Sequence, residues 1–154
     1  MALLDQQVRD QIGQLFEQLD GPVNMVFYTR RASPLVLPGQ SSDADCPSCS
    51  DEEQLLGELA GLSEKLSLEI HDQRSAPDVF REAGIDKVPA LVLRGQSTAG
   101  RVRFFGLPAG YEFSTLVADI VDVSRGTIEL SERTRSALEA LEEPVHLQVF
   151  VTPT

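Results

Sequence analysis

The spacing of apolar residues predicts that the chain opens with a helix followed by a buried strand. Apolar positions first recur every three or four residues, as on one face of an amphipathic helix, and Gly21-Pro22 ends the pattern. Residues 23–29 (VNMVFYT) are β-branched and aromatic, which is typical of a buried strand. The apolar positions of the helix are Leu4, Val8, Ile12, Leu15, Phe16 and Leu19.

A polar segment separates this strand from the next helix. Residues 31–45 are rich in proline, glycine and serine and form a loop that is long for a connection within a compact domain. We expect a helix to begin at Cys46, because Pro47 suits the first helical position, where its missing N–H is no loss. Acidic residues 51–53 lie in the early turns, where the helix dipole favours them. The apolar stripe of this helix is Leu55, Leu56, Leu59 and Leu62.

The following segments continue the alternation of strands and helices. Residues 66–70 alternate as a half-buried strand, and residues 77–83 form a short helix that Gly84 stops. Residues 90–93 and 102–105 predict a hairpin, and an amphipathic helix follows it, with apolar positions between Phe113 and Val121. This order predicts an α/β fold, with a central mixed β-sheet flanked by helices.

The last part of the chain resembles its first helix and strand. Residues 16–23 (FEQLDGPV) align without gaps with residues 138–145 (LEALEEPV). We therefore expect one domain over residues 1–126 and the start of a second, truncated unit over residues 127–154. Two unrelated helix-proline-strand passages are the alternative. The helix and strand predicted for the second unit cover residues 130–141 and 145–151.

Composition and charge argue against several classes of partner. Hydrophobic residues make up 42% of the chain and charged residues 24%, as in a soluble globular domain, and the longest apolar runs are too short to span a bilayer. The formal net charge of -11 argues against binding to nucleic acid or to an anionic membrane surface. The opening residues have no basic region followed by an apolar stretch, so we expect no signal peptide and a cytoplasmic location.

The two cysteines, Cys46 and Cys49, form the motif CPSC where a buried strand has ended and a helix begins. Unpaired N–H groups and the dipole at a helix N-terminus stabilise a thiolate and lower the pKa of its thiol. Residues three apart on a helical turn are close enough for a disulfide to form and reopen. We expect Cys46, the more exposed of the two, to attack a substrate disulfide and Cys49 to release the product.

Two other roles for the cysteine pair stay open. A zinc site needs two further Cys or His ligands, and the chain offers only His71 and His146, in separate predicted strands. Two inert cysteines near a helix start are the second alternative. We expect redox chemistry and no metal.

Several segments resemble the N-terminal unit of the protein disulfide oxidoreductases, which are glutaredoxin-like proteins with two tandem thioredoxin folds. The matching segments are LSLEIHD, IDKVPALVL, FFGLPAGYEFSTLVADIVDVSR and HLQVFVTPT. The opening helix and FFGLPAGYEF are also similar to the N-terminal domain of the flavoprotein subunit of alkyl hydroperoxide reductase. The resemblance implies a thioredoxin-like fold and a protein-disulfide oxidoreductase that needs no cofactor.

The resemblance also implies roles for individual residues. Cys46 is then the nucleophile, Cys49 the resolving cysteine and Pro89 a cis-proline beside them, while Val88 offers backbone groups to an extended substrate peptide. The implied partners are protein disulfides, with a flavoprotein thioredoxin reductase or a peroxidase as electron partner. The substrate-binding residues implied in this way are Pro47, Ser48, Val88 and Pro89.

Two features depart from the family pattern. Family members run from the first strand almost directly into CxxC, whereas residues 31–45 intervene here and place Asp43 and Asp45 beside Cys46. Nearby negative charge disfavours a thiolate, so these acids should raise the pKa of the Cys46 thiol. Arg30 and Arg31 offset this effect only if the loop folds back and brings them close. Val26 occupies the strand region where thioredoxins hold a buried carboxylate that accepts a proton, so we expect that group to be missing.

Two further functions and one assembly remain possible on these observations. The domain could be a non-catalytic docking or scaffold module, with CPSC covered by the long loop, or an electron relay to a peroxidase. In the predicted last strand, Leu147, Val149 and Val151 form an apolar face that needs a cover. We expect this tail to pair with a second copy in a homodimer.

Overall fold

The structure is a computed structural model that describes residues 2–31, 46–96, 101–127 and 129–150. Most of the predicted loop, with Asp43 and Asp45, therefore lies outside the described residues.

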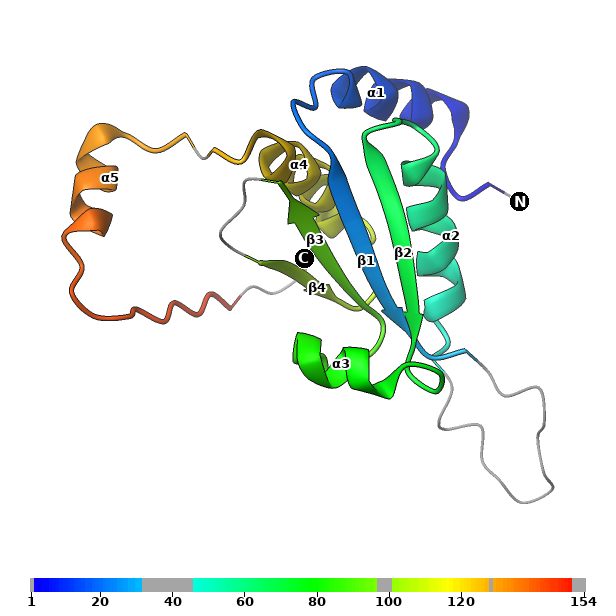
Figure 1. The fold of residues 1–154 in the computed structure, drawn as a ribbon. Coiled ribbons are helices and arrows are strands. Elements are labelled where there is room, and N and C mark those ends of the chain that lie inside the picture. Colours follow the sequence, from blue (N-terminus) through cyan, green and yellow to red (C-terminus); the bar gives the residue numbers. More distant parts are fainter. Residues whose placement is uncertain (1, 32–45, 97–100, 128, 151–154) are drawn as a thin grey trace.

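A mixed sheet of four strands in the order β2-β1-β3-β4 forms the centre of the protein (Figure 1). β1 pairs in parallel with β2 and antiparallel with β3, and β4 pairs antiparallel with β3. The predicted order of elements over residues 1–126 and the α/β fold class are confirmed. The strands are β1 (Val23–Thr29), β2 (Leu66–Asp72), β3 (Ala90–Gly95) and β4 (Val102–Phe105).

Helices cover both faces of this sheet. On one face, α1 (Gln6–Phe16), α2 (Cys49–Ala60) and α4 (Tyr111–Arg125) share a core with alternate residues of β1 and β3. On the other face, α3 (Pro77–Ala83) and the residues after it pack on the remaining β1 and β3 side chains. Because side chains alternate along a strand, β1 supplies both cores and is buried almost throughout.

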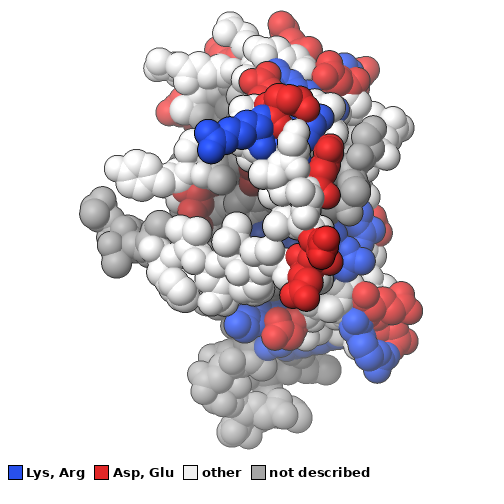
Figure 2. All heavy atoms as spheres, turned by 90° about the vertical axis from the view of Figure 1, so that its left-hand side faces the viewer, with Lys and Arg blue, Asp and Glu red and all other residues white. Residues whose placement is uncertain are grey.

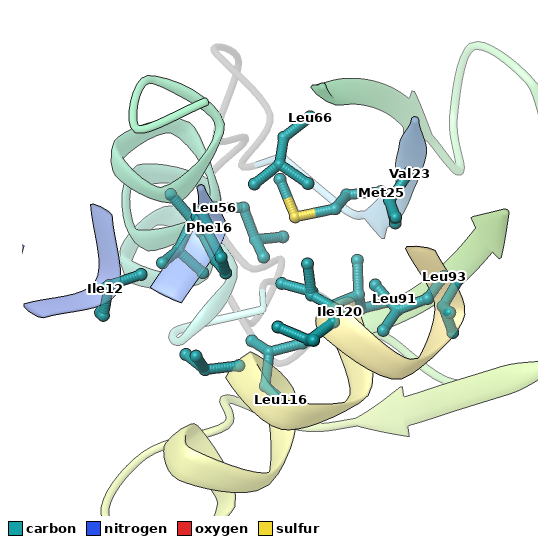
Figure 3. Close-up of a cluster of buried hydrophobic side chains, with 14 of the residues drawn as sticks. Ile12, Phe16, Val23, Met25, Leu56, Leu66, Leu91, Leu93, Leu116 and Ile120 are labelled. Atoms are coloured by element: carbon teal, nitrogen blue, oxygen red, sulfur yellow. The ribbon is translucent and has the colours of Figure 1, made fainter. Parts of the chain in front are cut away.

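The larger core lies between the sheet and its three covering helices (Figure 3). Side chains from α1, α2 and α4 converge there on the strand residues, and the sulfur of Met25 lies among them. Burying an aliphatic side chain of this kind contributes about 1.5–3 kcal/mol. The residues that Figure 3 labels are Ile12, Phe16, Val23, Met25, Leu56, Leu66, Leu91, Leu93, Leu116 and Ile120.

The C-terminal segment differs from the body of the protein. The predicted helix is present as α5 (Glu132–Glu139), but it lies apart from the sheet (Figure 1), and every residue from 129 to 150 is exposed. The prediction of a strand over 145–151 is wrong for residues 145–150, which form none. A strand is held by hydrogen bonds to a neighbour, and no described strand pairs with this segment.

Charged side chains of both signs are interspersed over the face shown in Figure 2, among many uncharged residues. No helix within the described ranges is both long enough and apolar enough to cross a membrane.

Candidate redox site

A disulfide joins Cys46 and Cys49, whose Cα atoms are 5.3 Å apart. The prediction that α2 begins at Cys46 is wrong by three residues, because α2 begins at Cys49 with Ser48 as its N-cap. The N–H of Cys49 donates to Cys46 O at 3.3 Å, a turn bond, and the first bond of helical spacing runs from Glu52 N to Ser48 O at 3.0 Å. Cys46 and Pro47 therefore lie in a turn that leads into the helix.

The two cysteines differ in their exposure to solvent. Cys49 is 3% exposed and contributes to the buried side of α2, whereas Cys46 is half-buried. Pro47 between them is exposed, and Ser48 is half-buried without a side-chain cap hydrogen bond. The prediction that Cys46 is the more exposed cysteine is confirmed.

An open hollow of about 580 Å³ lies beside the disulfide. One wall is the end of β1 with Thr29, Arg30 and Arg31, and the other consists of Cys46, Cys49 and the first turns of α2. Among the described residues, both cysteines of the disulfide therefore line this hollow.

Hydrogen bonds hold both arginines of the hollow in place. The Arg31 guanidinium donates to Glu53 Oε1 at 2.8 Å, and its backbone N–H donates to Asp72 Oδ2 at 2.9 Å. Arg30 Nε donates to Gln73 Oε1 at 2.7 Å. These contacts connect the end of β1 to α2 and to the end of β2, so the wall opposite the cysteines is fixed by three elements.

The Val88–Pro89 peptide bond is cis, and Pro89 is buried while Val88 is half-buried. In the β1–β3 register Ala90 faces Tyr28, which places Pro89 beside Thr29 at the same end of the sheet. The Pro89 carbonyl accepts a hydrogen bond from Gly106 N at 3.0 Å. The fold thus brings Pro89 to the strand end that also forms the hollow.

Glu52 is a buried acid in the first turn of α2, next to the site, that its sequence context does not single out. Its place among the acidic residues 51–53 predicts an exposed side chain at the helix start, yet its exposed fraction is 0%. Neither of its carboxylate oxygens has a hydrogen-bond partner among the described residues, and burial raises its pKa from 4.5 to about 8. The signal was its spacing, since Glu52 falls on the apolar stripe of α2, three residues after Cys49 and three before Leu55.

Comparisons with known proteins agree with this architecture. No family model matches the chain. The chain is 24% identical over 152 residues to the alkyl hydroperoxide reductase AhpF of Staphylococcus epidermidis, covering 99% of this chain and 25% of that protein. It is 34% identical over 96 residues to AhpF of Xanthomonas campestris pv. phaseoli, covering 61% of this chain and 15% of that protein. The chain therefore spans about a quarter or less of the length of these relatives.

Solved structures match over most of this chain. A protein disulfide oxidoreductase from Aeropyrum pernix matches with a TM-score of 0.71 and 24% identity, covering 91% of this chain and 57% of that one. A domain of alkylhydroperoxide reductase AhpF from Enterococcus faecalis matches with a TM-score of 0.69 and 21% identity, covering 91% and 62%. The fold is thioredoxin-like. The resemblance noted in the sequence is confirmed by both comparisons.

Within this thioredoxin-like fold, neither histidine lies with the cysteines. His71 Nε2 contacts Glu69 Oε1 at 2.8 Å, and its ring lies 5.6 Å from that of Tyr28, which packs in the smaller core beside α3. His146 lies in the exposed C-terminal segment. In the part of the chain that the structure describes, no three His, Cys, Asp or Glu residues lie close enough to hold a metal ion.

Proposed function

We propose that this domain exchanges thiols and disulfides with other proteins, with Cys46 as the attacking cysteine and Cys49 as the resolving cysteine. The observation that carries the proposal is the asymmetry of the pair. Cys46 is half-buried in an open turn beside the hollow, and Cys49 is buried at the first residue of α2. A substrate reaches the first sulfur more readily, and the second is held one turn away to finish the reaction.

The exchange proceeds in two displacements from the reduced domain. The Cys46 thiolate attacks one sulfur of a substrate disulfide, so a Cys46–substrate bond forms and the other substrate sulfur leaves as a thiolate. The Cys49 thiolate then attacks Cys46 Sγ, which forms the disulfide seen in the structure and releases the second substrate thiolate. Two electrons pass from the dithiol to the substrate, and both leaving thiolates take up protons.

We assign substrate binding to the surfaces next to the disulfide. Exposed Pro47 and half-buried Ser48 lie between the two cysteines. Half-buried Val88 precedes Pro89 at the strand end beside Thr29, which supports a role for its backbone in holding an extended substrate peptide. Residues of the hollow would contact side chains that flank the substrate cysteine.

A second candidate function is electron relay to a peroxidase, with a flavoprotein as donor. The matches to AhpF favour it, because the name alkyl hydroperoxide reductase links those proteins to peroxide reduction.

We also propose that residues 127–154 begin a second unit, since they repeat the first helix and residues 129–150 are all exposed.

A single close cysteine pair suits a reducing compartment, so we place the activity in the cytoplasm.

Reduction of insulin by dithiothreitol tests the proposed function. The chain should accelerate insulin precipitation, and Cys46→Ser should show only the rate of dithiothreitol alone. Cys49→Ser should form a mixed disulfide with insulin that a non-reducing gel detects. If the unaltered chain is no faster than Cys46→Ser, the domain is a docking or scaffold module instead.

A further inference from the structure

A second hollow lies on the face of the sheet that α3 covers. Figure 1 shows that α3 lies over one end of this face only. The hollow has a volume of about 420 Å³, which is within the range of sites that bind small molecules. Of the described residues, none lines both this hollow and the one beside the disulfide. The two hollows are therefore separate sites.

The floor of this second hollow is apolar and held in place by packing. Tyr28 of β1 and Val92 of β3 contribute from the sheet, and both are buried. Val79 and Ala83 contribute from α3. The Tyr28 ring packs edge-on against Phe80, with the ring centroids 5.0 Å apart. A flat apolar group can therefore lie against this floor without a rearrangement of the fold.

Three arginines from the last two strands line the same hollow, namely Arg94, Arg101 and Arg103. Leu93 pairs with Val102 in the β3–β4 register, so the next position of this register places Arg101 opposite Arg94. Like charges in directly opposite positions destabilise a sheet. A bound anion would offset this repulsion.

The acidic residues of the hollow do not cancel these three positive charges. Glu69 already has partners, since its Oε2 accepts a hydrogen bond from Asn24 Nδ2 at 3.1 Å and its Oε1 contacts His71 Nε2 at 2.8 Å. The Asn24 hydrogen bond, followed by the charges of His71 and Arg94, lowers the pKa of Glu69. Glu82 is exposed on α3. Two carboxylates and three guanidinium groups leave the hollow net positive, in a chain with a formal net charge of -11.

The arginines also have unused hydrogen-bond donors. Arg103 Nη2 donates to Ala83 O at 2.8 Å, which fixes this guanidinium against the end of α3. Its Nε is buried and has no partner among the described residues, and an unsatisfied buried donor calls for an explanation. Arg94 and Arg101 are exposed, and within the described ranges no hydrogen bond or ion pair holds their guanidinium groups. The hollow thus offers several donors to an acceptor with several oxygens.

We propose that this hollow binds a small phosphate-bearing molecule with a flat apolar part, independently of the cysteine pair. The phosphate oxygens accept hydrogen bonds from Arg94, Arg101 and Arg103, and the flat part lies against the apolar floor. The planar guanidinium matches both phosphate and carboxylate in geometry. A carboxylate has two oxygens, which one guanidinium can satisfy, so three arginines around one hollow favour phosphate.

Isothermal titration calorimetry with adenosine monophosphate as the probe tests this proposal. Inorganic phosphate, adenosine and citrate are titrated at the same ionic strength, because salt screens exposed charges. The unaltered chain is compared with Cys46→Ser and with a double variant carrying Arg94→Gln and Arg101→Gln. The matched control carries Arg133→Gln and Arg135→Gln, which remove the same charge from exposed positions on α5.

We expect adenosine monophosphate to bind, inorganic phosphate to bind more weakly and adenosine to show no binding. The double variant at Arg94 and Arg101 should lose about tenfold or more in affinity, and the control variant should stay within about twofold. Cys46→Ser should bind as the unaltered chain does. Without ligand, the double variant should unfold at the same or a higher urea concentration, because it removes facing like charges. This result would show that the loss of affinity is not a loss of fold.

Other outcomes overturn the proposal. No saturable binding of adenosine monophosphate at millimolar concentration would show that the hollow is not a site for this class of molecule. Equal weakening in the control variant would show a non-specific response to charge. Tighter binding of citrate than of either phosphate probe would indicate a carboxylate site instead. This proposal and the proposed exchange fail independently, because Cys46→Ser should abolish the exchange and leave phosphate binding unchanged.

Discussion

The two sides of the Cys46–Cys49 disulfide are built by different parts of the fold. On the open side, Cys46 lies in a turn before α2 and faces a hollow with two arginines. On the buried side, Cys49 begins the core-facing stripe of α2, which continues through Glu52. A helix that starts at the second cysteine therefore leaves the first one accessible. The CPSC motif alone does not determine which cysteine is accessible. The position of the motif between the end of β1 and the start of α2 determines it.

The charges near the site show the same contrast. The side chain of Glu53 on the open side pairs with Arg31 at 2.8 Å. That of Glu52, one residue earlier, is completely buried without a described partner. One position along a helix thus separates an acid that supports the wall of the hollow from an acid held in the core. Neighbouring residues of the same type can therefore have opposite effects on stability.

The largest effect should come from removing the buried charge. The pKa of Glu52 is raised from 4.5 to about 8, so the folded state binds a proton that the unfolded state has lost over this pH range. The free energy of unfolding should then fall as the pH rises from 4.5 to about 8, by about 1 kcal/mol per pH unit, and change no further above 8.

Urea unfolding of the oxidised chain and of Glu52→Gln checks this expectation. The Gln variant should be the more stable of the two above pH 5, by a margin that grows up to about pH 8. A margin that does not change with pH would mean that Glu52 stays ionised in the fold.

The core side of α2 should also tolerate truncation far less than the turn. Leu56→Ala removes a side chain with 0% exposure and should lower the free energy of unfolding by about 2–5 kcal/mol. Pro47→Ala, at an exposed position, should change it by less than about 1 kcal/mol. Chemical unfolding of both oxidised variants measures the contrast, and similar losses would contradict the division into open and buried sides.

Glu58 should have a smaller, pH-dependent effect. Its carboxylate accepts hydrogen bonds from Gln54, Leu3 N and Leu4 N, and Arg9 lies 3.3 Å away, so its pKa is lowered to about 2. The stabilisation is present above pH 4.5 and is lost as the pH falls towards 2. Glu58→Gln should thus lower the thermal midpoint at pH 7, and the difference should shrink near pH 2. An equal difference at both pH values would exclude this ionic contribution.

The smallest effect on domain stability should follow removal of the C-terminal segment. Residues 129–150 are all exposed, so a chain ending at Gly126 should unfold at the same urea concentration as the full chain. The exposed apolar side chains of the segment, among them Leu147, Val149 and Phe150, favour pairing with a second copy. Light scattering should therefore show a dimer for the full chain and a monomer for the shortened one. If light scattering shows that both chains are monomers at micromolar concentration, the segment does not mediate association.

Periodicity predicted the body of the fold because local pattern and burial agree there. The bounds of β1, α3 and β4 match the prediction, and Gly84 ends α3 in the left-handed conformation, as a glycine at that place allows. The start of α2 was missed because CPSC is compatible with both a first helical turn and the turn before a helix. Only the backbone hydrogen bonds distinguish these two possibilities.

The same reasoning explains why Glu52 and the predicted last strand were misjudged. A glutamate near a helix start is usually exposed to solvent and stabilised by the helix dipole. This common role explains the acidic residues at the start of α2 without burial, although Glu52 falls on the apolar stripe. Residues 145–150 have a strand-like pattern, but a pattern forms a strand only where a neighbour supplies hydrogen bonds. Burial and strand pairing depend on the neighbouring elements of the fold, so the sequence of a single segment does not determine them.

Competitive alkylation of the reduced chain tests the assignment of Cys46 and Cys49 most directly. The chain is treated briefly with a small amount of iodoacetamide at neutral pH, and mass spectrometry measures the label on each cysteine. Because Cys46 lies in the open turn and Cys49 is 3% exposed, Cys46 should carry nearly all the label. Equal labelling, or preferential labelling of Cys49, would contradict the assignment of Cys46 as the attacking cysteine.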